Sequence, residues 1–286
     1  MFKKIRLSKI IDHPHFNQFE KITVKHRYID EFECAMENSL IESKINGNSK
    51  AIILVGDGGT GKTSIIEHFV EGTQYQHIEL KSITLDSNTT VKSLSGALIQ
   101  KIDPNYSLNN GHSTAERTNI LVNLIRRNEI QILFLDEFQH ILHGNNSSDH
   151  ELVIIDWVKS LMNACKIVVV IAGIPSILDT LDTIQDAGQL KRRIEEKINL
   201  NISQNEEDVL YILRFIKTYI NKVQGVNLEI LDNDEMYKAI ANESQGKLDR
   251  IVKIIKQTTY SAIFHDRAVA NHDDFSYGVK HLHASD

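Results

Sequence analysis

The sequence has little cysteine and no hydrophobic run long enough for a membrane span. Its 286 residues contain two cysteines, Cys34 and Cys165, far apart and without metal-type spacing. A disulfide scaffold or a zinc site is therefore not expected, whereas a reducing compartment is. The longest apolar run, 167–172, has the length and β-branched content of a buried strand. The basic start of the chain is not followed by an apolar core of signal-peptide length. We expect a cytoplasmic protein with no membrane partner.

The chain also lacks an excess of positive charge. Its net charge is −6, which argues against a wholly basic nucleic-acid coat, although a local patch can still bind DNA. The first thirty residues differ from this average, since they hold seven Lys/Arg and three Asp/Glu. This basic arm is placed to meet DNA or an acidic partner, or it is a solvated extension. The length and the 41% hydrophobic content fit one compact domain with an appendage.

A glycine-rich loop lies between the apolar run 51–55 and a helix-like stretch. Strand, glycine loop and helix N-terminus in this order form the phosphate-binding loop (P-loop) of nucleoside triphosphatases. The glycines allow backbone N–H groups to turn toward phosphates, Lys62 adds a full positive charge, and the hydroxyl of Thr63 is a ligand for Mg²⁺. The residues predicted to bind the nucleotide are Gly56, Asp57, Gly58, Gly59, Thr60, Gly61, Lys62, Thr63 and Ser64.

Two carboxylates, Asp136 and Glu137, end another strand that reads as buried on both faces. Because the C-terminal ends of the strands face the phosphates in a P-loop fold, we expect Asp136 to hold the Mg²⁺ shell and Glu137 to polarise the attacking water. A solvated acidic turn is the alternative. The guanine-binding segment Asn-Lys-x-Asp of other P-loop proteins is missing. The predicted chemistry is hydrolysis of ATP.

Strand-like and helix-like patterns alternate as far as Ser203. Such alternation predicts an α/β fold in which helices cover both faces of a parallel sheet. Beyond Asn205 the apolar spacing becomes helical, which predicts a small lid. The expected parts are an N-terminal basic arm and helix (1–45), an α/β nucleotide-binding core (46–203) and a helical lid (204–286). The predicted strands are 51–55, 77–84, 131–135, 167–172 and 195–200, and the predicted helices of the core are 62–71, 91–102, 114–128, 150–164 and 175–182.

An α/β nucleotide-binding core followed by a helical lid resembles the AAA+ ATPases. In that family an arginine finger between the fourth and fifth strands reaches the γ-phosphate of a neighbouring subunit, and Arg192 and Arg193 match its place. A solvated basic turn is the alternative. The stretch that contains Lys247 and Arg250 resembles the sensor-2 helix of that family. The spacing does not decide which of the two residues would touch the phosphates. The turn 172–175 lacks the usual polar sensor-1 side chain, which argues against fast hydrolysis.

Among AAA+ branches, the chain is most similar to the TniB/TnsC transposition ATPases. Each matching segment alone also fits other branches, so the resemblance depends on the ordered set. The resemblance implies an ATP-dependent regulator that forms a homo-oligomer, either a ring or a helical filament, on duplex target DNA. It also implies recruitment or activation of a DDE transposase and work with a target-selector protein. The matching segments are Ile10–Phe16, Gly56–Ser64, Leu135–Ile141, Ala172–Pro175, Leu190–Arg193 and Ser244–Gly246.

Relatives grip the DNA backbone through residues that follow the second strand. Lys92 matches that position, with Ser113 and Thr114 across the next loop. Contacts of this kind are sensitive to salt and read no sequence. The alternatives are an ordinary exposed lysine and a helix N-cap. Two other functional classes stay open: an AAA+ ATPase of a secretion or partner-remodelling system that does not bind DNA, and a nucleotide-gated scaffold that hardly hydrolyses ATP.

Overall fold

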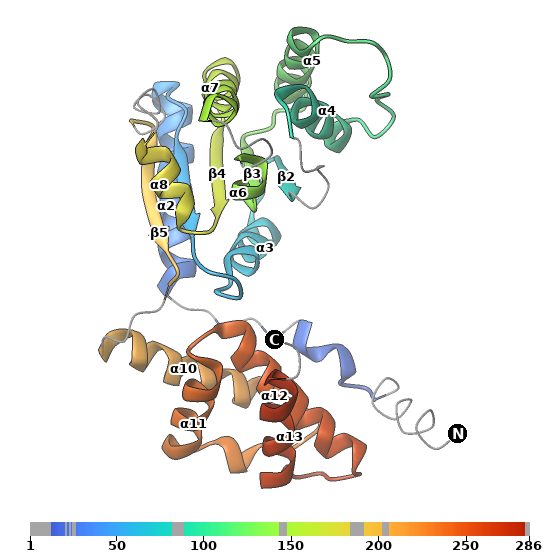
Figure 1. Cartoon of the computed structure of the whole chain (residues 1–286), viewed down its shortest axis with the longest axis vertical. Helices are drawn as coiled ribbons and strands as arrows, with labels where there is room; N and C mark the ends of the chain where they lie inside the picture. The colour runs from blue at the N-terminus through green and yellow to red at the C-terminus, as the bar shows by residue number, and fades with distance from the viewer. Residues whose placement is uncertain are drawn as a thin grey trace. The chain divides into compact units, whose positions relative to one another are not determined.

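The computed structural model describes residues 13–20, 22, 24, 27–81, 89–142, 148–183, 192–201 and 206–283. These residues fall into two compact units (Figure 1). The α/β unit holds Arg27–Gly58 and Lys62–Asn201, and the helical unit holds Gly59–Gly61 with the described residues before Arg27 and after Ile202. The division into 1–45, 46–203 and 204–286 stays a prediction.

A five-stranded parallel sheet with the order β2-β3-β4-β1-β5 forms the centre of the α/β unit. The central strands β1, β3 and β4 are buried along their whole length, as parallel strands covered on both faces must be. The register pairs Val55 with Gly173 and Lys81 with Asp136, so the C-terminal ends of β1, β3 and β4 lie at one edge. The strands are β1 (Ala51–Val55), β2 (His77–Lys81), β3 (Ile132–Asp136), β4 (Val168–Gly173) and β5 (Ile194–Asn199).

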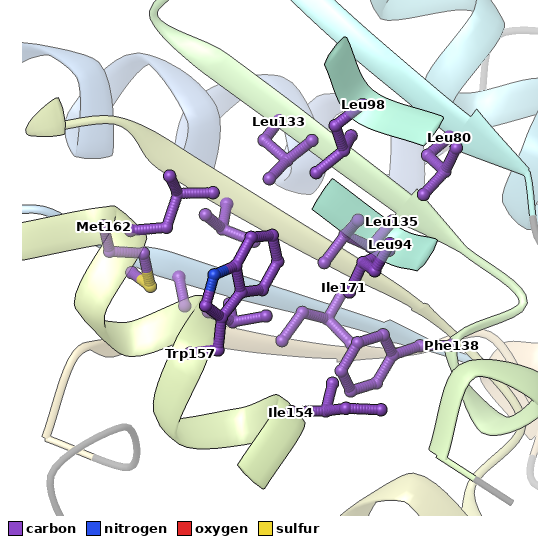
Figure 2. Close-up of a cluster of buried hydrophobic side chains, with 14 of the residues drawn as sticks. Leu80, Leu94, Leu98, Leu133, Leu135, Phe138, Ile154, Trp157, Met162 and Ile171 are labelled. Carbon is purple, nitrogen blue, oxygen red and sulfur yellow. The ribbon is translucent and has the colours of Figure 1, made fainter. Parts of the chain in front are cut away.

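Alternate residues of each strand face different helices, because successive side chains point to opposite faces of a sheet. On one face Leu133 and Ile171 join a cluster with Trp157, Leu94 and Phe138 (Figure 2). On the other face the ring of Phe134 lies near that of Phe69, which in turn meets Phe32. The helices of this unit are α2 (Arg27–Asn46), α3 (Lys62–Gly72), α4 (Val91–Ile102), α5 (Thr114–Arg127), α6 (Phe138–Leu142), α7 (Ser148–Cys165) and α8 (Ser176–Thr183).

The five strands and five core helices predicted from the sequence are all present. Residues 82–84 of the second predicted strand lie outside the described residues. The short helix α6, which directly follows Glu137, was not predicted. Cys34 and Cys165 are both free thiols.

The helical unit has a core of its own, to which residues close to the N-terminus contribute. Phe19 lies edge-on to Tyr260 with 5.6 Å between ring centroids, and Gln18 exchanges two hydrogen bonds with the backbone of Gln224. Of the seven basic residues among the first thirty, the structure describes only Arg27. None of the described helices is long and apolar enough to cross a membrane. The elements are η1 (Phe16–Glu20), α10 (Glu206–Lys222), η5 (Glu229–Leu231), α11 (Asp234–Ser244), α12 (Leu248–Phe264) and α13 (His272–His283).

Candidate nucleotide site

The predicted P-loop joins the buried strand β1 to the first residue of α3, Lys62. Gly59 and Gly61 have φ angles of +78° and +97°, which residues with a side chain rarely adopt. Gly56 donates its N–H to the carbonyl oxygen of Gly173 at 3.1 Å, so the start of the loop is tied to the end of β4. Strand, loop and helix N-terminus therefore follow one another as a phosphate-binding site requires.

Lys62 is buried beneath this loop, with 6% of its surface exposed. Its Nζ donates to the carbonyl oxygens of Gly56 at 2.6 Å and Asp57 at 3.0 Å. Burial lowers the pKa of Lys62 below its ordinary value, and the nearby carboxylates of Glu137, Asp136 and Asp57 oppose that shift. The ammonium group of Lys62 is thus held by two carbonyl oxygens, at a place where the phosphate oxygens of a bound nucleotide would compete for it.

Thr63 and Asp136, both predicted as metal ligands, are in contact. The Thr63 hydroxyl donates to Asp136 Oδ2 at 3.0 Å, and Asp136 Oδ1 accepts the N–H of Glu137 at 2.9 Å. Asp136 is 2% exposed, so both of its oxygens are fixed within the fold. A hydroxyl beside a carboxylate fits Mg²⁺, which binds few protein ligands together with substrate phosphates. Within the described part of the chain, no group of three or more His, Cys, Asp or Glu side chains is arranged to hold a metal ion.

Glu137 occupies an unusual backbone conformation, with a φ angle of +55°. Non-glycine residues seldom adopt this left-handed region, and such strain is concentrated at functional sites. The Glu137 carboxylate accepts a hydrogen bond from the side-chain amide of Gln139, and Gln139 Oε1 accepts the N–H of Ile174 at 3.2 Å. Sequence reasoning used the segment around Gln139 only as a family marker and missed this contact.

A second unpredicted residue, Asn201, also contacts the P-loop. Its Oδ1 accepts the N–H of Asp57 at 2.7 Å. Asn201 follows β5, whose residue Asn199 pairs with Val55 at the end of β1. The pairing of the two strands therefore places Asn201 beside the loop. No local signal in the sequence points to this residue.

The two arginines predicted as fingers have different surroundings. Arg193 donates to the Ser49 hydroxyl at 2.6 Å, and its carbonyl oxygen accepts the N–H of Ala51 at 2.8 Å. Ala51 is the first residue of β1, whereas the P-loop follows the last residue of β1. Arg193 therefore lies at the opposite end of this strand from the P-loop of its own chain. Arg192 is exposed. The preceding residues of the predicted finger segment, 189–191, lie outside the described residues.

The residues predicted to contact DNA lie at the N-termini of α4 and α5. Lys92 is exposed in the first turn of α4. Ser113 is the N-cap of α5 and forms a capping box with Glu116. The helix N-cap, which is the alternative to a DNA contact, is therefore present at Ser113. Thr114 is the exposed first residue of α5. In the capping box the hydroxyl oxygen of Ser113 accepts the N–H of Glu116, which leaves the hydroxyl proton of Ser113 for another acceptor.

A buried arginine connects these two helix starts. Arg117 is 5% exposed and donates to the carbonyl oxygen of Lys92 at 3.3 Å and to that of Leu108. A Cβ atom at Gly96 would lie 2.8 Å from Arg117 Nη1, so glycine at this position leaves room for the guanidinium. Arg117 therefore ties the first turn of α4 to the loop that leads into α5.

The predicted sensor-2 residues begin α12 in the helical unit. Lys247 is the N-cap position and makes no side-chain capping bond. Arg250 donates to Gln245 Oε1 at 3.3 Å, and Gln245 ends α11 in the left-handed conformation. The contact of Lys247 or Arg250 with phosphates stays a prediction.

Comparison with protein families gives one match that spans most of the chain. Residues 16–204 match the family model of the bacterial TniB protein. The chaperone protein ClpB of Mycoplasma pneumoniae is 29% identical over 180 residues, which make up 63% of this chain and 24% of that protein. ClpB of Mycoplasma genitalium is 29% identical over 182 residues. The chain spans about a quarter of the length of these curated relatives.

Solved structures share the fold at low sequence identity. The Aeropyrum pernix ORC2 protein, solved in ADPNP and ADP complexes, has a TM-score of 0.67 and 14% identity over 90% of this chain and 68% of its own. Cdc6p from Pyrobaculum aerophilum has a TM-score of 0.66 and 15% identity over 92% of this chain and 70% of its own. These neighbours confirm the predicted AAA+ fold class, and the family match supports ATP hydrolysis.

Proposed function

This chain belongs to the TniB family, and from that premise we propose that it is an ATP-dependent regulator of DNA transposition. It binds and hydrolyses ATP, assembles with copies of itself on duplex target DNA, and recruits or activates a DDE transposase together with a target-selector protein. The observation that carries the ATPase part is the linked group Lys62, Thr63, Asp136 and Glu137 at one edge of the sheet. The family match carries the transposition part.

The residues of the P-loop divide the chemistry among them. Backbone N–H groups of the loop and the N-terminus of α3 bind the phosphates, and Lys62 exchanges its two carbonyl partners for phosphate oxygens. Mg²⁺, when bound, neutralises charge on those oxygens, with Thr63 and Asp136 as its protein ligands.

Glu137 acts on the attacking water. As the water oxygen bonds to the γ-phosphorus, the carboxylate accepts the water proton, and the bond from the γ-phosphorus to the bridging oxygen breaks to release ADP. This role is supported by the position of Glu137, which directly follows the buried strand β3 at the same end of the sheet as the P-loop. The reaction is hydrolysis of ATP to ADP and phosphate.

Of the two arginines, Arg192 is our choice for the finger that acts in the neighbouring subunit. Arg193 already bonds to Ser49, and its release would leave that contact unmade, whereas Arg192 is exposed. A guanidinium supplied by a neighbour stabilises the charge on the transferred phosphoryl group and makes hydrolysis depend on assembly. Arg192→Ala should remove the dependence of the rate on protein concentration, whereas Arg193→Ala should keep that dependence and lower the unfolding temperature. The opposite pattern would assign the finger to Arg193.

The proposed DNA contact combines Lys92, Ser113 and Thr114 with two helix N-termini. The N-terminus of a helix carries partial positive charge and binds phosphate groups. Arg117 holds the two helix starts in one arrangement. This surface would follow the DNA backbone without reading bases.

Electron microscopy of the purified chain with duplex DNA and a slowly hydrolysed ATP analogue tests the assembly. We expect rings or helical filaments on DNA, formed only with nucleotide, and fewer of them for Lys92→Ala. Lys101→Ala is the matched control, since Lys101 is exposed in the last turn of the same helix. An absence of nucleotide-dependent assemblies on DNA would favour the partner-remodelling ATPase.

A further inference from the structure

Gln139 is a buried amide placed between the catalytic carboxylate and the end of a neighbouring strand. It lies in the first turn of α6, two residues after Glu137, and is 4% exposed. A buried amide must have partners at both its nitrogen and its oxygen. Both partners are present here, and neither belongs to the helix that carries Gln139.

The two partners fix the orientation of the amide. A carboxylate only accepts hydrogen bonds and a backbone N–H only donates them. Nε2 of Gln139 therefore faces Glu137 Oε2, and Oε1 faces the N–H of Ile174, at 3.2 Å. The reverse orientation would oppose two acceptors and two donors. The side chain is thus a directional bridge from the turn after β4 to the Glu137 carboxylate.

Gly173 provides the space for this bridge. A Cβ atom at position 173 would lie 2.2 Å from Gln139 Oε1 and 2.4 Å from Ile177 Cδ1, so a side chain there displaces the amide or its neighbour. The carbonyl oxygen of Gly173 also accepts the N–H of Gly56, at 3.1 Å. The turn after β4 therefore has two contacts with the site. The carbonyl oxygen of Gly173 contacts the P-loop, and the N–H of Ile174 contacts Gln139, which in turn contacts Glu137.

We propose that Gln139 is a positioning residue for ATP hydrolysis, which orients the Glu137 carboxylate toward the attacking water and couples that orientation to the turn after β4. The turn 172–175 has no polar side chain, and the bridge gives its backbone a route to the reaction. The bond engages Oε2 of Glu137 and leaves Oε1 to accept the water proton. This inference rests on the proposed role of Glu137.

The first variant removes the hydrogen bonds and keeps the size of the side chain. Gln139→Leu should lower kcat about tenfold to a hundredfold, because a catalytic group that is free to rotate spends little time in the productive geometry. The KM for ATP should change less than about twofold, because Lys62, Thr63 and Asp136 are untouched. Turnover at saturating ATP, with circular dichroism as the check on folding, gives both values. A kcat within about twofold of the parent would overturn the proposal.

A double-mutant comparison separates this proposal from its premise. If Gln139 acts through Glu137, Gln139→Leu should cause no further loss in a Glu137→Gln background. A second loss of the same size would show that Gln139 acts elsewhere. If Glu137→Gln alone hydrolyses ATP at the parent rate, the role of Glu137 fails. If Glu137→Gln is slow and Gln139→Leu is not, the present inference alone fails.

Gly173→Ala approaches the same bridge from the other side. It should lower kcat as Gln139→Leu does, because the added methyl group meets the amide oxygen. In a Gln139→Ala background that oxygen is gone and only the contact with Ile177 Cδ1 remains, so the further loss of kcat from Gly173→Ala should be smaller than in the parent chain. A further loss as large as that in the parent chain would contradict the bridge and assign to Gly173 a separate role in packing.

Discussion

The nucleotide site and the proposed DNA contact differ in how firmly the chain itself holds their residues. Lys62 and Asp136 are buried and bonded within one continuous set of contacts that runs from the P-loop to the end of β3. Lys92 and Thr114 are exposed at helix starts. A buried site depends on interactions that the fold has already made, whereas an exposed contact gains its strength from the partner and weakens with salt. Substitutions should therefore affect the two regions differently.

The largest effect should come from the reacting carboxylate. Glu137→Gln keeps the size of the side chain and cannot accept the water proton, so turnover should fall at least about a hundredfold. ATP binding should persist, because Lys62 and the loop are unchanged. Isothermal titration and a turnover assay on the same preparation measure the two quantities. Turnover near that of the parent chain would remove Glu137 from the mechanism.

Lys62→Met should remove nucleotide binding without weakening the fold. At ATP a hundredfold above the dissociation constant, the parent chain should gain about 2.7 kcal/mol of stability, and the variant should gain almost none. In the folded chain, burial lowers the pKa of Lys62 below its ordinary value of 10.5. At a pH below this lowered pKa the charge of Lys62 therefore opposes folding, and this cost disappears as the pH rises past 10.5. The nucleotide-free variant should therefore unfold at the same temperature as the parent or higher at neutral pH.

Thermal unfolding with and without ATP and Mg²⁺ gives both results for Lys62→Met. Lys101→Ala is the control and should keep the full gain from nucleotide. A variant that loses stability without nucleotide would show that the two carbonyl contacts of Lys62 outweigh the cost of its burial.

Arg117→Ala should destabilise the hairpin of α4 and α5 by about 2 kcal/mol, because two carbonyl groups lose their charged donor in a buried place. Hydrolysis without DNA should stay within about twofold of the parent, since the two carbonyl groups that Arg117 binds, those of Lys92 and Leu108, lie outside the P-loop. DNA affinity should fall, because Lys92 and Ser113 lose their common support. Thermal unfolding, DNA binding and basal turnover together check the prediction. A change in basal turnover alone would contradict it.

The smallest effect should come from the exposed lysine. Lys92→Ala should weaken DNA binding about equally for all sequences and lower the slope of log affinity against log salt by about one phosphate contact. Binding series at increasing salt on two unrelated duplexes measure both. Lys101→Ala should leave affinity and slope closer to those of the parent. A sequence-dependent loss would contradict a backbone contact.

Local patterns predicted the parts of this chain that local physics determines. The central strands β1, β3 and β4 have continuous apolar runs, and the P-loop has glycines at the positions where φ becomes positive, so both can be recognised without a partner segment. Gln139 and Asn201 were not predicted, because their roles depend on contacts with Ile174 and Asp57. Neither contact has a periodic signal in the sequence. The five-residue helix α6 is too short to show a helical period.

The surroundings of the predicted arginines also depend on contacts distant in sequence. Nothing in their local segment distinguishes Arg192 from Arg193. The hydrogen bond between Arg193 and Ser49 exists because β5 pairs with β1. Ser113 and Thr114, by contrast, are distinguished locally, because Glu116, three residues after Ser113, closes a capping box on Ser113. Only the choice between the two arginines depends on a partner distant in sequence.

The rate of ATP hydrolysis per subunit, measured against protein concentration with and without duplex DNA, tests the central claim most directly. If the chain assembles on DNA and completes its site with an arginine from a neighbour, the rate per subunit should rise with concentration and rise again when DNA is added. Replacing Arg192 and Arg193 together by Ala should abolish the stimulation by DNA and leave ATP binding intact. A rate per subunit that is independent of both concentration and DNA would contradict the assembly mechanism and favour an ATPase that remodels a protein partner.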